Sequence, residues 1–275
     1  MQKLILFCLL LLKLEVYAQE LVEREWITDL PVSFTDLERD ENGNIYTSIS
    51  IYNFDPDTAA AVAMKFNSDL ELIWAKQLKT LSDDDLGSTQ ILSDGHILFG
   101  GSLGAFFSPL LGSSLYKLDE NGNVIWAKVY PGSGDDRISY IFEFDNGNLL
   151  LGVPRGVSGE PTRFLYTDPQ GEILDQFSFE YSGESVRFGS IQQIDSVFYG
   201  SAVIFDSQVD RIIGLMMSFT IDQVLWAKTF DPGVEVSSLA LTPHPGGGFT
   251  FRGRVEDPQN LLTGWDILLG KTDVE

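Results

Sequence analysis

The sequence predicts an all-β fold, a β-propeller of four-stranded blades, and three observations lead to this prediction. An apolar pair followed by Trp-Ala-Lys occurs at residues 72–76, 124–128 and 224–228. The first two copies are about 50 residues apart and the third follows after about twice that interval, which is the period of one propeller blade. Asn-Gly or Asp-Gly turns recur between β-rich runs with the same period. Hydrophobic residues make up 44% of the chain, enough for a large core.

The turns divide each repeat into four strands. The first hairpin turns at Gly43, Gly95 and Gly147, each preceded by Asn or Asp, and we expect type I′ turns, which need positive φ at both central residues. A second hairpin follows in each copy, and its outer strand carries the Trp-Ala-Lys phrase. Five copies of the inner elements predict five blades in one domain, residues 19–275. The expected blades are residues 31–80, 81–131, 132–182, 183–231, and 232–275 completed by 19–30.

The last blade lacks an outer strand of its own in this interpretation. The fifth copy reaches Glu275 before its outermost strand, and the residues around Trp26 resemble an additional Trp-Ala-Lys strand. We therefore expect the N-terminal strand, residues 19–30, to complete the last blade and close the ring, which leaves few exposed strand edges. The alternative is that the sequence is an incomplete part of a larger ring.

Residues 1–18 have the pattern of a secretory signal peptide, with a short positive start and an apolar run before Ala18. Cleavage there would remove Cys8, the one cysteine of the sequence, so neither disulfides nor cysteine chemistry is expected. The apolar run is too short to span a membrane, and no later stretch approaches about 20 apolar residues. We expect a secreted, extracellular or cell-surface protein without membrane insertion.

The charge of the chain restricts its partners. With 40 acidic and 18 basic residues, the net charge is −22. Such a charge argues against nucleic acid or an anionic membrane as a partner. Proteins, glycans and cations remain, and we expect a monomer or a component of a larger surface assembly.

Two repeat segments carry a resemblance to a known group of proteins. They are WAKVYPGSGDDRISYIFEFDNGNLLLG at 126–152 and LYKLDENGNVIWAK at 115–128, and they resemble the repeats of secreted bacterial β-propeller proteins. The likeness extends over essentially the whole chain after residue 18. It implies a secreted or surface protein and no defined catalytic residues. The third copy departs from the pattern because Asp175 replaces the tryptophan, so we expect its blade contact to be packed differently.

Tryptophans at the equivalent repeat position admit two interpretations. They are Trp26, Trp74, Trp126 and Trp226. Flat aromatic rings can stack on sugars, but a large ring at the same place in each outer strand is suited to packing neighbouring blades together. We therefore interpret these tryptophans as structural.

An acidic residue follows each Trp position by nine or ten residues. These residues are Asp36, Asp84, Asp135, Asp136, Glu184 and Glu235. We expect each to lie in the loop that feeds the next inner strand, so that the propeller gathers them into an acidic ring. Because like charges repel, the ring would hold a cation such as Ca²⁺, water or a basic group of a partner. The alternative is that these carboxylates are solvated or cap turns, and no other cofactor is expected.

One inter-strand loop of the second repeat is unusually apolar. Its apolar residues are Phe106, Phe107, Leu110 and Leu111. They predict either an exposed partner site or a segment folded down over its blade. The two histidines, His96 and His244, occupy corresponding places in different blades, so we expect neither a metal site nor a catalytic triad from them.

These observations favour a non-catalytic binding or scaffold module that recognises a protein or a glycan at one face of the propeller. The leading alternative is a carbohydrate-active enzyme of glycosidase type using two axial carboxylates, which would have to lie about 5–10 Å apart. A third interpretation is that the chain is only a spacer within a larger surface protein.

Overall fold

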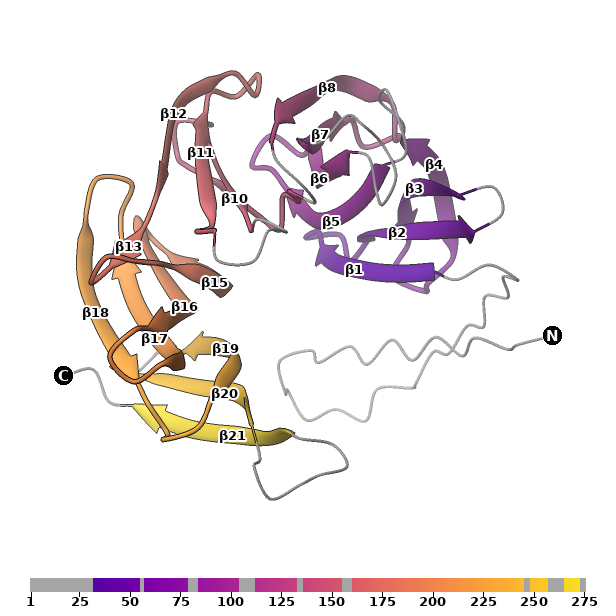
Figure 1. The fold of residues 1–275 in the computed structure, drawn as a ribbon. Helices are drawn as coiled ribbons and strands as arrows, with labels where there is room; N and C mark the ends of the chain where they lie inside the picture. The colour runs from indigo at the N-terminus through magenta and orange to yellow at the C-terminus, as the bar shows by residue number, and fades with distance from the viewer. Residues whose placement is uncertain are drawn as a thin grey trace. The chain divides into compact units, whose positions relative to one another are not determined.

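The computed structural model confirms an all-β fold built from repeated antiparallel sheets, as expected for a β-propeller (Figure 1). It comprises two compact units, Met1–Ile141 and Phe142–Glu275, which are described separately below. The described residues are 32–54, 57–78, 84–103, 112–132, 136–154, 160–244, 248–256 and 265–272. The predicted signal peptide, the predicted closing strand with Trp26, and the apolar loop with Phe106, Phe107, Leu110 and Leu111 lie outside these ranges.

The first unit contains two four-stranded sheets, each formed by strands consecutive in the chain. The first sheet consists of β1 (Val32–Arg39), β2 (Ile45–Phe54), β3 (Asp57–Phe66) and β4 (Leu72–Leu78). The second consists of β5 (Asp84–Ile91), β6 (Ile97–Leu103), β7 (Gly112–Leu118) and β8 (Val124–Pro131). The inner strands β6 and β7 are buried at every residue, because their apolar and small side chains pack on both faces of the sheet.

The second unit contains the remaining sheets. Its first four-stranded sheet consists of β9 (Tyr140–Glu143), whose first residues precede the unit boundary, β10 (Leu149–Val153), β11 (Arg163–Thr167) and β12 (Ile173–Ser178). A two-stranded ribbon follows, β13 (Glu180–Tyr181) and β14 (Glu184–Ser185). The next sheet consists of β15 (Arg187–Ile194), β16 (Val197–Asp206), β17 (Arg211–Phe219) and β18 (Val224–Phe230). The last has three strands, β19 (Val236–Pro243), β20 (Phe249–Glu256) and β21 (Trp265–Thr272).

The predicted type I′ turns are wrong. In the turn between β1 and β2, Gly43 has φ of 84°, but Asn42 before it is not among the residues with positive φ. The Asp40 carboxylate accepts a hydrogen bond from Asn44 N at 2.8 Å, and Gly43 N donates to Asp40 O at 3.0 Å. The side-chain cap stabilises a longer loop, a type I turn followed by a glycine in the left-handed region. Asp119 closes the β7–β8 turn in the same way.

Trp74 connects the two sheets of the first unit. Its side chain is only 9% exposed and joins a buried cluster with Tyr46, Phe99 and Tyr116. The indole Nε1 donates to the carbonyl of Glu120, in the β7–β8 turn of the neighbouring sheet, at 3.0 Å. A Cβ atom at Gly122 would lie 2.9 Å from the indole ring, so this turn approaches the ring closely.

In the second unit the equivalent packing differs from sheet to sheet. Asp175, which replaces the tryptophan in β12, is exposed. This sheet and the next are instead joined by phenylalanines, with Phe164 at 5.5 Å from Phe188 and 5.7 Å from Phe219 between ring centroids. In the following sheet Trp226 contacts Phe249 of β20 at 5.9 Å between centroids. The Trp126 side chain, in the first unit, is half-buried.

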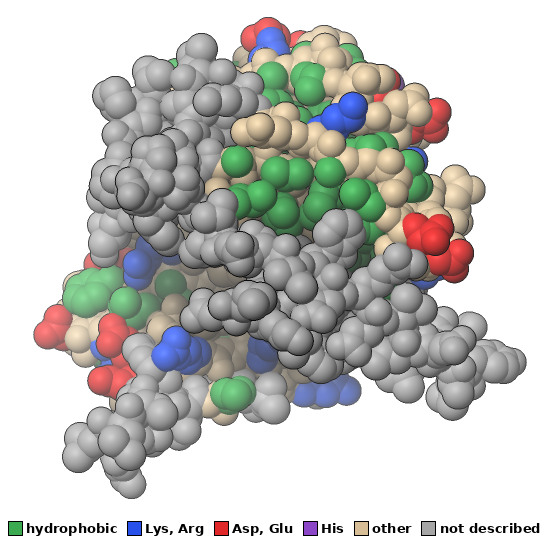
Figure 2. Space-filling view, turned by 90° about the vertical axis from the view of Figure 1, so that its right-hand side faces the viewer, with side chains coloured by type: hydrophobic (Ala, Val, Ile, Leu, Met, Phe, Trp, Pro, Cys, Tyr) green, Lys and Arg blue, Asp and Glu red, His purple; other side chains and the backbone are tan. Residues whose placement is uncertain are grey.

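The outer strands begin with two consecutive exposed apolar residues in all four of the four-stranded sheets. The pairs are Leu72 and Ile73, Val124 and Ile125, Ile173 and Leu174, and Val224 and Leu225. Figure 2 shows hydrophobic side chains gathered in one area of the face that it presents. Each pair precedes the Trp position by one and two residues, and it persists in the copy that has Asp175.

Candidate functional site

Two of the predicted acids of the first unit have structural roles. Asp36 lies within β1 rather than in the loop before it, which corrects the prediction for this residue. Its carboxylate accepts hydrogen bonds from Thr89 N at 3.0 Å and Leu37 N at 2.9 Å, so it ties β1 to β5 of the next sheet. Asp136 is fully buried, and a Cβ atom at Gly132 would collide with its carboxylate. Asp36 therefore joins two sheets, and Asp136 is enclosed within the fold.

The side chains of the other two predicted acids of the first unit, Asp84 and Asp135, are not described. Asp84 is the first residue of β5, and its side chain lies outside the described part of the structure, as does Asp135 entirely. The neighbouring Asp85, which the repeat spacing did not single out, is 1% exposed. It accepts a hydrogen bond from Ser50 of the first sheet and forms an ion pair with Arg137. This pair joins three successive repeats of the chain and is structural.

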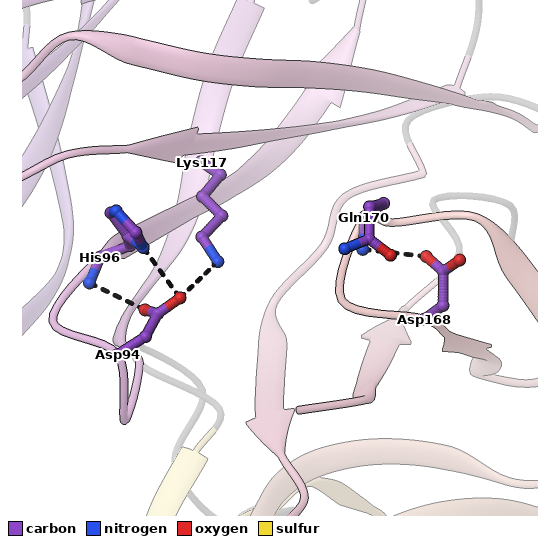
Figure 3. A network of polar contacts seen from close by, with 5 residues as sticks. All are labelled: Asp94, His96, Lys117, Asp168 and Gln170. Atoms are coloured by element: carbon purple, nitrogen blue, oxygen red, sulfur yellow. Dashed lines mark hydrogen bonds and ion pairs between the residues drawn. The ribbon is translucent and has the colours of Figure 1, made fainter. Parts of the chain in front are cut away.

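His96 belongs to a polar network at the β5–β6 turn (Figure 3). Its Nδ1 lies 2.8 Å from Asp94 Oδ2, and Lys117 Nζ contacts the same oxygen at 2.8 Å. Burial pushes the pKa of Asp94 upward, but hydrogen bonds from Lys117 and His96 outweigh it and lower the pKa to about 2. Asp94 is thus an ionised anchor for the turn and cannot act as a proton donor near neutral pH. Figure 3 also shows Asp168, which accepts from Gln170 N at 2.9 Å and caps another turn.

A hollow of about 380 Å³, open to solvent, lies between the last two sheets of the second unit. The β16–β17 loop and the β18–β19 connection form its walls, together with the end of β20. Its lining residues are Phe205, Asp210, Arg211, Gly233, Val234, Glu235 and Glu256. Among the predicted acids whose side chains the structure describes, Glu235 is the one that lines this hollow. Glu184, by contrast, lies in β14 rather than in a loop.

Local hydrogen bonds fix the walls of the hollow. Asp206 pairs with Arg211 across the hairpin and accepts from Gln208 N at 2.8 Å, which shapes the loop between them. Arg211 contacts both carboxylate oxygens of Asp231, with Nη2 2.5 Å from Oδ2 and Nε 3.2 Å from Oδ1. The hydrogen bond from Arg211, with one from Gly233 N, lowers the pKa of Asp231. The guanidinium is thus held in place by a bidentate contact.

Three carboxylates in the hollow have no such contact. No hydrogen bond or ion pair between described residues reaches the side chains of Asp210, Glu235 or Glu256. Glu235 and Glu256 are neighbours, because Glu256 N donates to Glu235 O at 2.8 Å. Phe205 adds an apolar surface at this site, since 43% of it is exposed. The hollow thus combines an aromatic ring with acceptor groups that the fold itself does not use.

The sequence pointed to part of this site. The repeat offset identified Glu235, but Arg211 and Glu256 lie at the ends of loops that read as ordinary polar connections. The sequence offered one signal, which was the place of these residues in the repeat. Two inter-strand loops at corresponding positions are bordered by them, one running from Phe205 to Arg211 and the other beginning at Glu256.

Within the described ranges, no three His, Cys, Asp or Glu side chains are grouped to hold a metal ion. The same part of the chain contains no helix that is long and apolar enough to cross a membrane.

Solved structures with a similar fold are known. An ulvan lyase from a polysaccharide lyase family has a TM-score of 0.57 at 9% identity, with 86% of this chain and 69% of that one covered. A protein described as an exo-β-1,3-galactanase from Bifidobacterium bifidum has a TM-score of 0.50 at 10% identity, with 88% and 87% covered. A β-1,3-galactosidase has a TM-score of 0.43 at 8% identity over 86% of this chain, which spans 55% of its length.

The first two likenesses bear on the fold alone, because the identities are so low, and nothing is inferred from the third. The structures that this chain resembles are β-propeller proteins, in agreement with the repeated sheets. No family model matches the sequence. No curated protein matches it either.

Proposed function

We propose that the chain is a secreted or cell-surface, non-catalytic binding module whose ligand site is the hollow between the last two sheets. The observation that supports this proposal is the contrast between acids. Asp36, Asp85 and Asp94 are engaged by backbone amides or cationic side chains. Glu235 and Glu256 face a hollow beside an exposed aromatic ring and have no such contact among the described residues. Unused polar groups around an aromatic surface are typical of ligand sites.

The test is an array of glycans and peptides probed with the protein lacking residues 1–18, with and without Ca²⁺. Binding should weaken at least about tenfold, or about 1.4 kcal/mol, in Phe205→Ala and in Glu235→Gln. Leu174→Ala and Glu41→Gln are the matched controls, since each makes the same kind of change at an exposed residue outside the hollow. Ligands bound equally by all four variants would refute the hollow as the site.

Of the acids in the predicted ring, only Glu235 is still proposed as a residue that binds Ca²⁺. A requirement for Ca²⁺ in the array, lost in Glu235→Gln, would support a cation at this residue. Binding that is indifferent to chelation would remove Ca²⁺ from the proposal. The module would act as a monomer or within a larger surface assembly, and light scattering on the purified protein distinguishes the two.

A second candidate is a carbohydrate-active enzyme, and the neighbouring Glu235 and Glu256 are the observation that favours it. Two carboxylates about 5–10 Å apart can serve as acid and as base or nucleophile in glycoside hydrolysis. Release of reducing sugar from galactans, lost in Glu235→Gln and in Glu256→Gln, would establish this activity. Intact binding without any sugar release favours the binding module.

A further inference from the structure

We propose that the hollow binds a cationic nitrogen group, an ammonium or guanidinium such as a lysine or arginine side chain of a partner polypeptide carries. This inference rests on the proposed function, because it names the ligand class of the same hollow. Its first support is charge. Among the described residues that line the hollow are three carboxylates, those of Asp210, Glu235 and Glu256, and a single cation, Arg211.

Arg211 does not offset these charges, because its charge is already paired with that of Asp231. Two of its nitrogens contact the two oxygens of Asp231, so the pair is neutral as a whole. The hollow therefore keeps a net negative charge on a chain whose overall charge is −22. Anionic ligands such as phosphates or carboxylates would meet repulsion there, whereas a cation is attracted.

The hydrogen-bond chemistry of the acidic side chains also suits a cation. Asp210, Glu235 and Glu256 only accept hydrogen bonds when ionised, and they outnumber Arg211, the donor side chain beside them. Backbone N–H of Gly233, a nearby donor, is already bonded to Asp231 at 2.8 Å. An ammonium group has three donors and no acceptor, so it matches this set of groups.

Phe205 supplies the remaining feature that a cationic side chain needs. Its ring is 43% exposed and lines the hollow together with Val234. A cation over an aromatic ring gains about 0.5–2 kcal/mol. The methylene stem of a lysine can cover the ring and Val234 while its ammonium reaches the carboxylates. A polypeptide side chain thus uses both the apolar and the acidic part of the site.

The test measures binding of a fluorescein-labelled peptide of alternating lysine and glycine by anisotropy, in low and in physiological salt. The same peptide with acetylated lysines is the matched probe, because acetylation removes the charge and keeps the length. We expect Glu235→Gln/Glu256→Gln to weaken binding at least about tenfold and Phe205→Ala several-fold. The control variant Glu41→Gln/Asp175→Asn makes the same change in net charge at exposed residues elsewhere and should change binding less than about twofold.

Each outcome decides a separate point. Equal loss in the hollow variant and the charge-matched control would overturn the proposal, because binding would then reflect the overall negative charge. Hollow-dependent binding of acetylated peptide, or of neutral glycans on the array, would overturn the cation while leaving the hollow as the binding site. Spermidine that competes with the peptide through the same residues supports the cation chemistry and identifies free amines as a second source. Circular dichroism of each variant verifies that it is folded.

Discussion

Replacing Trp74 by alanine should lower the free energy of unfolding by about 4 kcal/mol. The side chain is 9% exposed, so nearly all of it leaves water on folding. An aromatic side chain that buries about 150–250 Å² contributes about 4–6 kcal/mol at about 25 cal/mol per Å², an upper bound. Substitutions of buried tryptophan by alanine destabilise proteins by about 3–5 kcal/mol. Its hydrogen bond to Glu120 adds about 1 kcal/mol at most, because Glu120 is exposed and water can replace the indole.

Urea unfolding followed by far-ultraviolet circular dichroism measures this loss without relying on tryptophan fluorescence. Trp74→Phe should lose only about 1–2 kcal/mol, since most of the apolar area is kept while the indole N–H is removed. Trp226→Ala is the matched control at the same repeat position, and its half-buried ring predicts a smaller loss. A loss below about 1.5 kcal/mol for Trp74→Ala, or one no larger than that of Trp226→Ala, would refute the claim that Trp74 holds the two sheets together.

Three further predictions concern other parts of the chain. Gly122→Ala should destabilise the protein by about 1–2 kcal/mol in urea, because φ is 78° and the new methyl meets Trp74, and by less in the Trp74→Ala background. Burial, and then nearby Asp36, raises the pKa of Glu38 from 4.5 to about 7, so stability should fall as the pH rises from about 4.5 to about 7. Glu38→Gln should remove about 1 kcal/mol of that decline after solvent screening, and an unchanged pH profile would contradict this. Deleting residues 19–30 should markedly lower the melting temperature if they complete the last sheet, whereas an unaltered melting temperature would exclude strand exchange.

The repeat was readable from the sequence because its hydrophobic and turn residues act locally. Strand periodicity and the spacing of the glycine turns predicted four-stranded sheets, and the described residues form four of them, followed by a last sheet of three strands. The turn type was wrong because Asx caps compete with the expected turn. Asp40 and Asp119 each accept the amide four residues later, which stabilises a longer loop.

The candidate site was less predictable because it depends on which acids the fold engages. Asp36 and Glu235 follow their Trp positions by ten and nine residues, yet Asp36 accepts a hydrogen bond from Thr89 N of the next sheet while Glu235 lines the hollow. Asp36 lies within β1, at the register shift between Phe34 and Leu37, whereas Glu235 directly precedes β19, and the offset from the Trp position does not encode this one-residue difference. The ion pair of Arg211 could not be predicted either, because its partner Asp231 lies twenty residues away along the chain.

The outer strands affect whether the protein aggregates with other chains. Each is the last strand of its sheet and begins with exposed apolar residues, which would invite another strand to pair with it. Lys76, Lys128 and Lys228 follow at the same repeat position. Lysine on an edge strand disfavours further pairing, since an added strand would have to desolvate the charge. Three of only 18 basic residues are thus placed where they help to keep the protein from aggregating through its own repeat.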